Sequence, residues 1–522
     1  MCGILAIIWN IYKQKKENTN SIQLGFESLS KRGPESGNIH EDMHGIFCFK
    51  RLAINDLSSS GMQPFVKGRV SVVCNGEIYN HLKLKQKYNV STVSSSDCEC
   101  ILELYLLLGF EKMIKELNGI FAIVISDDNF VYFATDRIGV RPLHYGFSIN
   151  ENLIIGSTAE SLSFFRFNGE IKNFKPSIAS YNKTSNEISF VEYGCSVDEI
   201  NYPLYPRINK LLEKAVRNQL ISDRPIGCML SGGLDSSLIC SILCKSLGAK
   251  NVRTYSIGMK GSTDLKYARF LSTELGTNHT EVLFTPDEGI AAIPFVIKDL
   301  ESYDITTVRA SVGMWLLSKY ISKNTQDKVI FSGEGADELF CGYLYFHYAP
   351  SFDELNKESK RLVDNLYKYD VLRADRCVSS HGLELRVPFL DNKLVSFCMS
   401  MTGKSKSPIN GIEKDVLRQS FSTGYLPADI LWRRKEGYSD GVSSIEKSWC
   451  EYIKDHVEMQ ISNQEFEPVS TQYPSKEAYY YKKIFDDMFP TYRPVIEYWM
   501  PKWIDCNGDP SGRKLPIFNK SR

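Results

Sequence analysis

The stretch Ser231-Gly232-Gly233-Leu234-Asp235-Ser236-Ser237 decides the fold of the second half of this chain. An apolar run, residues 226–230, precedes it, and apolar residues at spacings of three and four follow it. This order predicts a strand, a turn and a helix. Two glycines let the turn approach a ligand closely, and the N–H groups of a helix N-terminus favour anions. The stretch therefore predicts a cradle for pyrophosphate.

Similar units of strand and helix surround this turn. Strands are predicted at residues 226–230, 252–257, 281–284 and 329–332, with amphipathic helical patterns between them. This alternation predicts a doubly wound parallel sheet, which binds ligands at the carboxyl ends of its strands. Residues from about 340 onward read mostly as helices, so the predicted α/β domain has a helical C-terminal part.

The first half of the chain has a different pattern. Short β-type runs at residues 69–74, 119–126 and 130–134, and a helical pattern at 102–108, predict a layered sandwich of sheets flanked by helices. The proline-containing residues 197–206 suit a connector. We therefore expect one domain over residues 1–195, a second over 207–505, and a disordered tail over 506–522.

Composition excludes several classes of protein. The 522 residues contain 62 Lys+Arg and 62 Asp+Glu, a balance that argues against bulk attraction to nucleic acid. No apolar run approaches the length of a membrane span, and residues 1–9 lack the basic flank and cleavage site of a signal peptide. The 14 cysteines are scattered, and several lie in apolar runs. This usage predicts free thiols in the reducing cytoplasm.

Acidic residues near the predicted cradle point to a metal ion. Asp235 stands in the turn itself, and an acid beside phosphates needs a bridging cation, for which Mg²⁺ is the natural candidate. A second glycine-containing string, Ser332-Gly333-Glu334-Gly335-Ala336-Asp337-Glu338, follows another short strand. One of its carboxylates suits the metal and another suits proton transfer or substrate orientation. The alternative is that both strings are only capped helix starts.

Basic residues form a third cluster between residues 433 and 441. Lys435 stands beside turn residues there, an arrangement that suits polyphosphate binding. A solvated basic loop is the alternative.

Cys2 predicts a second kind of chemistry in the first half. If Met1 is removed, Cys2 carries both a thiol and a free α-amine, with ordinary pKa values of about 8.5 and 7.7–8.0, so the amine can activate the thiol. Asn75 and Gly76 suit an oxyanion hole, and Arg51 and Asp97 can hold the carboxylate and ammonium of an amino acid. The alternative is a buried cysteine in an N-terminal strand.

These motifs resemble known families. The string 231–237 resembles the PP-loop of ATP pyrophosphatases, which cleave ATP between the α and β phosphates. The strings 332–338, 373–376, 384–391 and 435–440, together with the segment 303–311, resemble glutamine-hydrolysing asparagine synthetases in order and spacing. In the first half, Cys2 and its candidate partners, with the strings 32–34 and 136–143, resemble class II glutamine amidotransferases of the Ntn type.

The resemblance implies a two-site ligase that uses aspartate, glutamine and ATP with Mg²⁺. Glutamine would release ammonia at one site, and ammonia would displace AMP from β-aspartyl-AMP at the other, after passing within the chain. The implied catalytic residues are Cys2, Asn75, Gly76, Glu334 and Lys435. The implied glutamine-binding residues are Arg51, Leu52, Ala53, Ile54, Asn55, Asn75, Gly76, Glu77 and Asp97. The implied ATP-binding residues are Leu230, Ser231, Gly232, Gly233, Asp235, Ser236, Ser237, Ile257, Ser332 and Gly333, with Asp235 and Asp337 as metal ligands.

Some positions depart from the family pattern, and two other functions stay open. Glu35 replaces the usual Asp, Ala336 a common Ser, Val312-Gly313 a Thr-Pro, and Gly437 a common Gln. One alternative function is amidation of another carboxylate. The other is a non-catalytic glutamine or nucleotide sensor. No nucleic-acid or membrane partner is expected, and a homodimer stays open.

Overall fold

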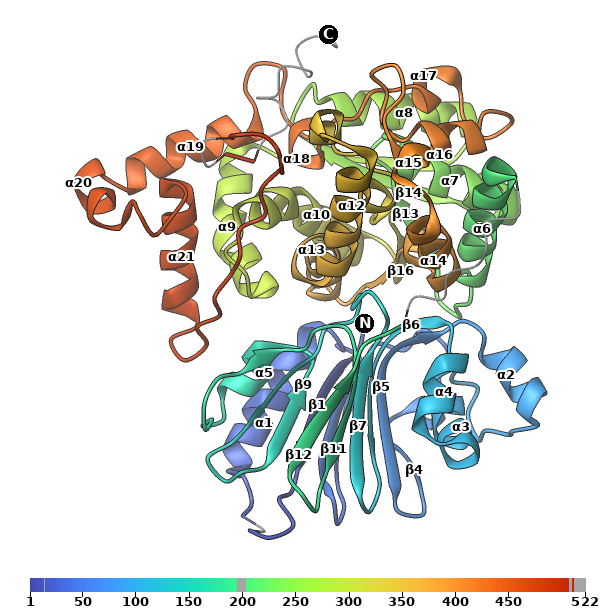
Figure 1. Cartoon of the computed structure of the whole chain (residues 1–522), viewed down its shortest axis with the longest axis vertical. Helices are drawn as coiled ribbons and strands as arrows, with labels where there is room; N and C mark the ends of the chain where they lie inside the picture. The colour runs from blue at the N-terminus through green and yellow to red at the C-terminus, as the bar shows by residue number, and fades with distance from the viewer. Residues whose placement is uncertain (14, 195–202, 507–508, 511–522) are drawn as a thin grey trace.

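The computed structural model describes residues 1–13, 15–194, 203–506 and 509–510. The chain forms two domains that lie against one another (Figure 1). Two antiparallel sheets build the N-terminal domain, and a parallel sheet within a shell of helices builds the C-terminal domain. The predicted architecture of both halves is therefore confirmed.

The N-terminal domain contains two six-stranded sheets. The first has the order β10-β8-β9-β1-β3-β2 and the second the order β12-β11-β7-β6-β5-β4. The strands of the first are β1 (Gly3–Ile8), β2 (Ser36–Glu41), β3 (Gly45–Arg51), β8 (His144–Phe147), β9 (Leu153–Gly156) and β10 (Lys172–Asn173). Those of the second are β4 (Phe65–Lys67), β5 (Val70–Ile78), β6 (Gly119–Ser126), β7 (Phe130–Thr135), β11 (Ile178–Asn182) and β12 (Glu187–Val191).

Continuous apolar runs allow each sheet to be covered on both faces. In β1, Ile4 and Ala6 belong to the core between the sheets, whereas Leu5 and Ile7 pack under helices on the outer face. Because successive strand residues point to opposite faces, only a run that is apolar throughout can serve both layers. The helices that cover the outer faces are α1 (Thr19–Ser28), α2 (His81–Tyr88), α3 (Cys100–Leu108), α4 (Phe110–Glu116) and α5 (Ala159–Ser163).

The C-terminal domain is built on a five-stranded parallel sheet in the order β15-β14-β13-β16-β17. The strands are β13 (Ile226–Met229), β14 (Arg253–Gly258), β15 (Asn278–Leu283), β16 (Val329–Phe331) and β17 (Glu384–Arg386). Four were predicted and β17 was missed. A three-residue strand of the sequence Glu-Leu-Arg shows no apolar run, and it forms because its charged side chains pair with one another in the interior.

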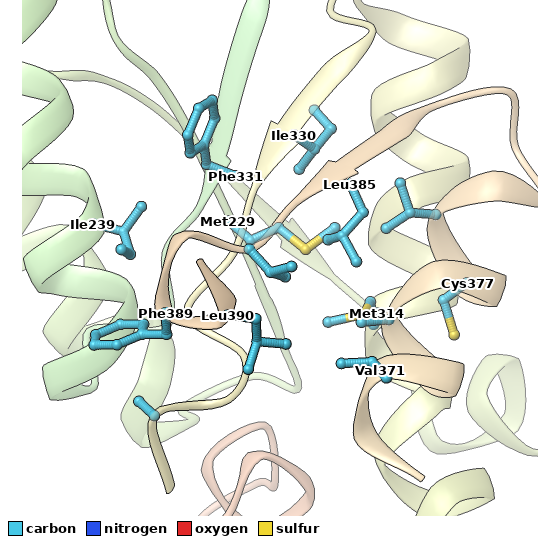
Figure 2. Packing of buried hydrophobic residues seen from close by; sticks show 14 of the residues in the cluster. Met229, Ile239, Met314, Ile330, Phe331, Val371, Cys377, Leu385, Phe389 and Leu390 are labelled. Carbon is cyan, nitrogen blue, oxygen red and sulfur yellow. The ribbon is translucent and has the colours of Figure 1, made fainter. Parts of the chain in front are cut away.

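Helices enclose both faces of this sheet. Figure 2 shows Met229, Ile330 and Leu385 from three strands packed with Met314 and Val371 from helices. The helices are α6 (Leu204–Asn218), α7 (Leu234–Leu247), α8 (Thr263–Leu275), α9 (Pro286–Leu300), α10 (Ile305–Asn324), α11 (Ala336–Leu339), α12 (Phe352–Asn365), α13 (Asp370–Ser379), α14 (Asn392–Ser400), α15 (Gly403–Lys406), α16 (Asp415–Ser420), α17 (Ala428–Leu431), α18 (Tyr438–Gly441), α19 (Trp449–Gln460), α20 (Asn463–Phe466) and α21 (Lys476–Met488). None of the helices in the described ranges is long and apolar enough to cross a membrane.

The predicted connector is partly helical. Residues 195–202 lie outside the described residues, but α6 begins at Leu204, inside the predicted connector 197–206. Pro206 stands in the first turn of α6, where a helix tolerates proline because the missing N–H has no partner there. Pro206 therefore marks the start of a helix, and residues 197–202 of the predicted connector lie outside the described residues.

Buried charges join the two domains. Arg32 and Arg141 of the N-terminal domain lie 2.8 and 3.2 Å from the two carboxylate oxygens of Asp375, on α13. The α-amine of Met1 donates a 3.0 Å hydrogen bond to the carbonyl of Leu383. These contacts fix the N-terminal strand against the parallel-sheet domain.

Candidate functional site

Cys2 lies directly before β1 and contacts Asn75 on β5 of the other sheet. Its backbone N–H donates a 3.0 Å hydrogen bond to Oδ1 of Asn75, and its Sγ lies 3.5 Å from the carbonyl oxygen of Leu52. Burial raises the pKa of the Cys2 thiol. A base close to the sulfur is therefore needed to form the nucleophilic thiolate.

The candidate oxyanion hole lies within a strand rather than after one. Asn75, Gly76 and Glu77 were expected to follow the strand, but they are part of β5 and pair with Ala122, Phe121 and Ile120 of β6. A Cβ atom at Gly76 would lie 2.2 Å from the carbonyl oxygen of Ile120, so only glycine fits. The Nδ2 atom of Asn75 is buried and has no hydrogen-bond partner among the described residues, which leaves a donor for an oxyanion.

The remaining residues that are predicted to bind glutamine surround Asn75 and Gly76. Arg51 ends β3, and its guanidinium donates to the carbonyl oxygens of Ser58, at 2.5 Å, and of Asp56. Asn55 donates to Glu77 and, at 3.3 Å, to Asp97.

Leu52, Ala53 and Ile54 form the buried loop between Arg51 and Asn55. The structure therefore brings together all nine residues that are predicted to bind glutamine.

Two carboxylates at this site are buried side by side. Burial raises the pKa of Asp97, and burial together with the Asp97 charge raises the pKa of Glu77. Paired buried carboxylates gain from a cationic partner, because the cation offsets both desolvation and mutual repulsion. Arg386 lies 3.6 Å from Glu77 and opposes the rise in its pKa, and the ammonium group of an amino acid would supply a further cation.

The glycine turn between β13 and α7 forms the second centre. Gly232 has φ +70°, and a Cβ there would lie 2.5 Å from the backbone of α8, so the turn depends on glycine. Ser231 and Ser236 close the turn: Ser236 Oγ lies 3.2 Å from the N–H of Ser231 and 3.0 Å from its Oγ. Helix α7 begins directly after this turn, at Leu234, and the N–H groups of a helix N-terminus favour anions.

The second glycine string packs directly on this turn. A Cβ at Gly333 would lie 2.7 Å from the backbone nitrogen of Ser236. Ser332 donates its N–H to the carbonyl of Arg386 on β17, at 2.9 Å. Parallel strands β13 and β16 are neighbours, so both strings leave the same edge of the sheet.

A cavity of about 750 Å³ opens at this edge. Most of the residues that are predicted to bind ATP line this cavity, including Leu230 and Ile257, but Gly232 and Ser237 do not. Ser237 is fully buried because it is one helical position beyond Ser236, which rotates its side chain about 100° away from the cavity. Ser237 therefore does not line the cavity, and its assignment to ATP binding stays a prediction.

Two lysines lie between the predicted metal ligands. Lys414 Nζ lies 2.6 Å from Asp235 and 2.7 Å from Asp337, and Lys435 Nζ lies 2.6 Å from the other oxygen of Asp337. Burial alone would raise the pKa of Asp337, but the two ammonium groups outweigh burial and hold it below its usual range.

The sequence did not reveal Lys414, which is almost fully buried before the short helix α16. The only local signal is the alternation of charges in Glu413-Lys414-Asp415, which is also typical of a solvated surface.

Glu334 faces the same cavity from the second string. Arg373, on α13, donates a 2.7 Å hydrogen bond to its carboxylate and a 2.9 Å bond to Asp370. Burial raises the pKa of Glu334, while the Arg373 guanidinium acts in the opposite direction. A carboxylate with a raised pKa in a cavity suits proton transfer.

The C-terminal segment forms another wall that the sequence did not reveal. Trp499, Ile504 and Asp505 line the cavity, and Asp509 lies 2.8 Å from Arg309 of α10. Residues 507–508 and 511–522 of the predicted disordered tail lie outside the described residues.

Comparisons with known proteins agree with these two centres. The profile of the glutamine amidotransferase domain matches residues 1–186, and the asparagine synthase profile matches residues 207–363 and 350–503. Proteins named glutamine-hydrolyzing asparagine synthetase from Cricetulus griseus and Mus musculus are each 40% identical to this chain, and the one from Homo sapiens is 39% identical. Each match covers 100% of both chains. The chain belongs to the family of glutamine-hydrolysing asparagine synthetases.

Proposed function

We propose that this chain makes asparagine from aspartate, with glutamine as nitrogen donor and ATP as energy source. The observation that supports this most strongly is that one chain joins the Cys2–Asn75 site to the cavity between the two glycine strings. Neither a simple glutaminase nor a simple nucleotide-binding protein needs both.

At the first site, Cys2 is the nucleophile. Its sulfur attacks the amide carbon of glutamine, ammonia leaves, and water then hydrolyses the thioester to glutamate. The α-amine of Cys2, freed by removal of Met1, takes the thiol proton. Asn75 Nδ2 and the N–H of Gly76 stabilise the oxyanion, while Arg51 and Asp97 bind the carboxylate and ammonium groups of glutamine.

At the second site, a carboxylate oxygen of aspartate attacks the α-phosphorus of ATP. The bond to the bridging oxygen breaks, which gives β-aspartyl-AMP and pyrophosphate. Lys414 and Lys435 neutralise the charge that develops on the pyrophosphate, and the serines and N–H groups of residues 231–236 orient it. Ammonia then attacks the acyl carbon, Glu334 accepts a proton, and AMP leaves.

Asp235 and Asp337 fit a magnesium ion. The Oδ1 atom of Asp235 is buried without a hydrogen-bond partner among the described residues, and Mg²⁺ commonly uses one or two carboxylates together with substrate phosphates. These two residues would hold the ion, which would neutralise phosphate charge when bound.

Aspartate-dependent release of pyrophosphate tests the proposal. Purified protein with ATP and Mg²⁺ should release pyrophosphate with aspartate, and it should form asparagine when glutamine or ammonia is added. Release with another carboxylic acid but not with aspartate would contradict the choice of acceptor. Release of neither pyrophosphate nor glutamate would contradict the enzyme function.

We further propose the two-domain division at residues 1–195 and 207–505 and a location in the cytoplasm. The 13 cysteines in the described part of the chain are all free thiols, which suits a reducing compartment. A homodimer stays a prediction, and sedimentation equilibrium would test it.

A further inference from the structure

Two residues of the C-terminal domain hold the candidate glutamine-binding loop. Arg224 donates a 2.8 Å hydrogen bond from Nε to the carbonyl of Ala53, and its terminal nitrogen lies 2.7 Å from Oε1 of Glu35. The other oxygen of Glu35 accepts the N–H of Ala53 at 2.9 Å. Both backbone polar groups of Ala53 are therefore satisfied by one bridge between domains.

The adjacent residue, Asp223, extends this bridge along the loop. Its N–H donates to the carbonyl of Ile54 at 2.9 Å, and its carboxylate accepts the N–H of Asp56 at 2.8 Å. The carbonyl of Asp56 in turn accepts from Arg51. The chain from Arg51 to Asp56 is thus fixed from outside its own domain.

Residues 223 and 224 also lead into the strand of the phosphate turn. Pro225 accepts a 3.3 Å hydrogen bond from Val329 of β16, and β13 begins at Ile226. Strand β13, which ends at Met229 just before the phosphate turn, is therefore continuous with the residues that hold the glutamine loop.

We propose that Glu35 and Arg224 are positioning residues for glutamine, acting through the backbone of Ala53. The proposal rests on the assignment of residues 51–55 to glutamine binding under Proposed function. Glu35 stands where the family usually has Asp, and its longer side chain reaches Ala53 and Arg224 at once. A shorter side chain would give up one of the two contacts.

The exposure of this pair separates a positioning role from a stabilising role. The side chains of Arg224 and Glu35 are 26% and 30% exposed, and ion pairs with such access to water contribute little to stability. Their loss should therefore change the binding of glutamine more than the folding of the chain.

Kinetics of four single variants and one double variant test the proposal. Arg224→Ala should raise KM for glutamine about tenfold, the effect of one lost positioning hydrogen bond to a charged group, and leave ammonia-dependent synthesis unchanged. Arg224→Lys should recover part of the loss. Glu35→Gln and Glu35→Asp should each raise KM for glutamine, and the double variant Glu35→Gln with Arg224→Ala should be no worse than Arg224→Ala alone.

Lys31→Ala is the matched control. Lys31 and Asp299 also form an ion pair between the two domains, at 2.5 Å, but neither contacts the loop. The KM of the Lys31→Ala variant for glutamine should not change. An unchanged KM in Arg224→Ala, or an equal rise in Lys31→Ala, would overturn the proposal.

The wild-type protein distinguishes this proposal from the proposed function. If it hydrolyses no glutamine, the function itself fails. If it hydrolyses glutamine and the Arg224 variants match it, only the positioning role fails. If Arg224→Ala does not fold, as shown by loss of ammonia-dependent synthesis, the positioning role is tested by KM for glutamine in the two milder variants, Glu35→Gln and Glu35→Asp. An unchanged KM in both would then overturn it.

Discussion

Lys414 donates a 2.6 Å hydrogen bond to the carboxylate of Asp235, an acid in the first turn of α7. The same ammonium group reaches Asp337 in the second glycine string. Lys414 thus neutralises both carboxylates that the proposed mechanism assigns to Mg²⁺. Binding of the metal with ATP would free Lys414 from these carboxylates to contact the phosphates.

Replacement of Lys414 by alanine should impair the synthetase site alone. We expect kcat/KM for ATP to fall by roughly 10²-fold or more, because a buried group that stabilises transition-state charge is lost. Glutamine hydrolysis should not change. Pyrophosphate release and glutamate formation, measured side by side, check this. Lys404→Ala, at an exposed position nearby, is the control, and an equal loss in both variants would refute the role of Lys414.

Replacement of Cys2 should separate the two half-reactions. Cys2→Ala should abolish use of glutamine and leave ammonia-dependent synthesis intact, because the ATP cavity contains no part of the thiol site. Asn75→Ala should lower glutaminase kcat by about 10²–10³-fold, the usual effect of losing one oxyanion donor. Loss of ammonia-dependent synthesis in folded Cys2→Ala would show that the two sites are not independent.

Local sequence predicted the parts of the fold that depend on local chemistry. The glycine turn at Gly232 and the apolar run of β6 follow from backbone freedom and from strand periodicity, so they could be read directly. The strand β17 could not, because its Glu384 and Arg386 are stabilised by each other and by neighbours distant in sequence.

The candidate site shows the same difference between residues that local sequence reveals and residues that only the fold brings in. Residues inside recognisable strings, such as Ser231 and Glu334, line the cavity as expected. Lys414 reaches the cavity from a separate element, and its charge is typical of a surface until the fold buries it. Ser237 belongs to such a string but is buried away from the cavity, because membership of a string does not fix the side of the helix that a residue occupies.

The pH profile of the synthetase site should depend on Arg373. Arg373 opposes the effect of burial on Glu334, and the nearby carboxylates of Asp370 and Asp337 act in the same direction as burial. Arg373→Gln should therefore raise the pKa of Glu334 further. Since Glu334 must be ionised to accept a proton, the acid limb of the rate profile should move to higher pH.

Aspartate-dependent exchange of pyrophosphate into ATP is the suitable measurement for the first half of this reaction, because it avoids the titration of ammonia. Asparagine formation at saturating ammonia then reports the second half. Arg361→Gln removes an arginine that pairs with Glu358 outside the cavity, and it should leave the profile in place. A limb that stays fixed, or moves to lower pH, in Arg373→Gln would contradict the assigned role of Glu334.

The stability of the two-domain arrangement should depend strongly on Asp375. This carboxylate is fully buried and pairs with both Arg32 and Arg141 across the domain interface. Asp375→Ala would leave two buried guanidinium groups without their counter-charge, and breaking a buried pair in this way typically costs about 3–5 kcal/mol. Urea unfolding should show this loss, whereas Glu192→Ala, which breaks a pair whose side chains are 61% and 75% exposed, should cost less than about 1 kcal/mol. Equal losses in the two variants would mean that Asp375 does not hold the domains together, because burial is the property that separates the two ion pairs.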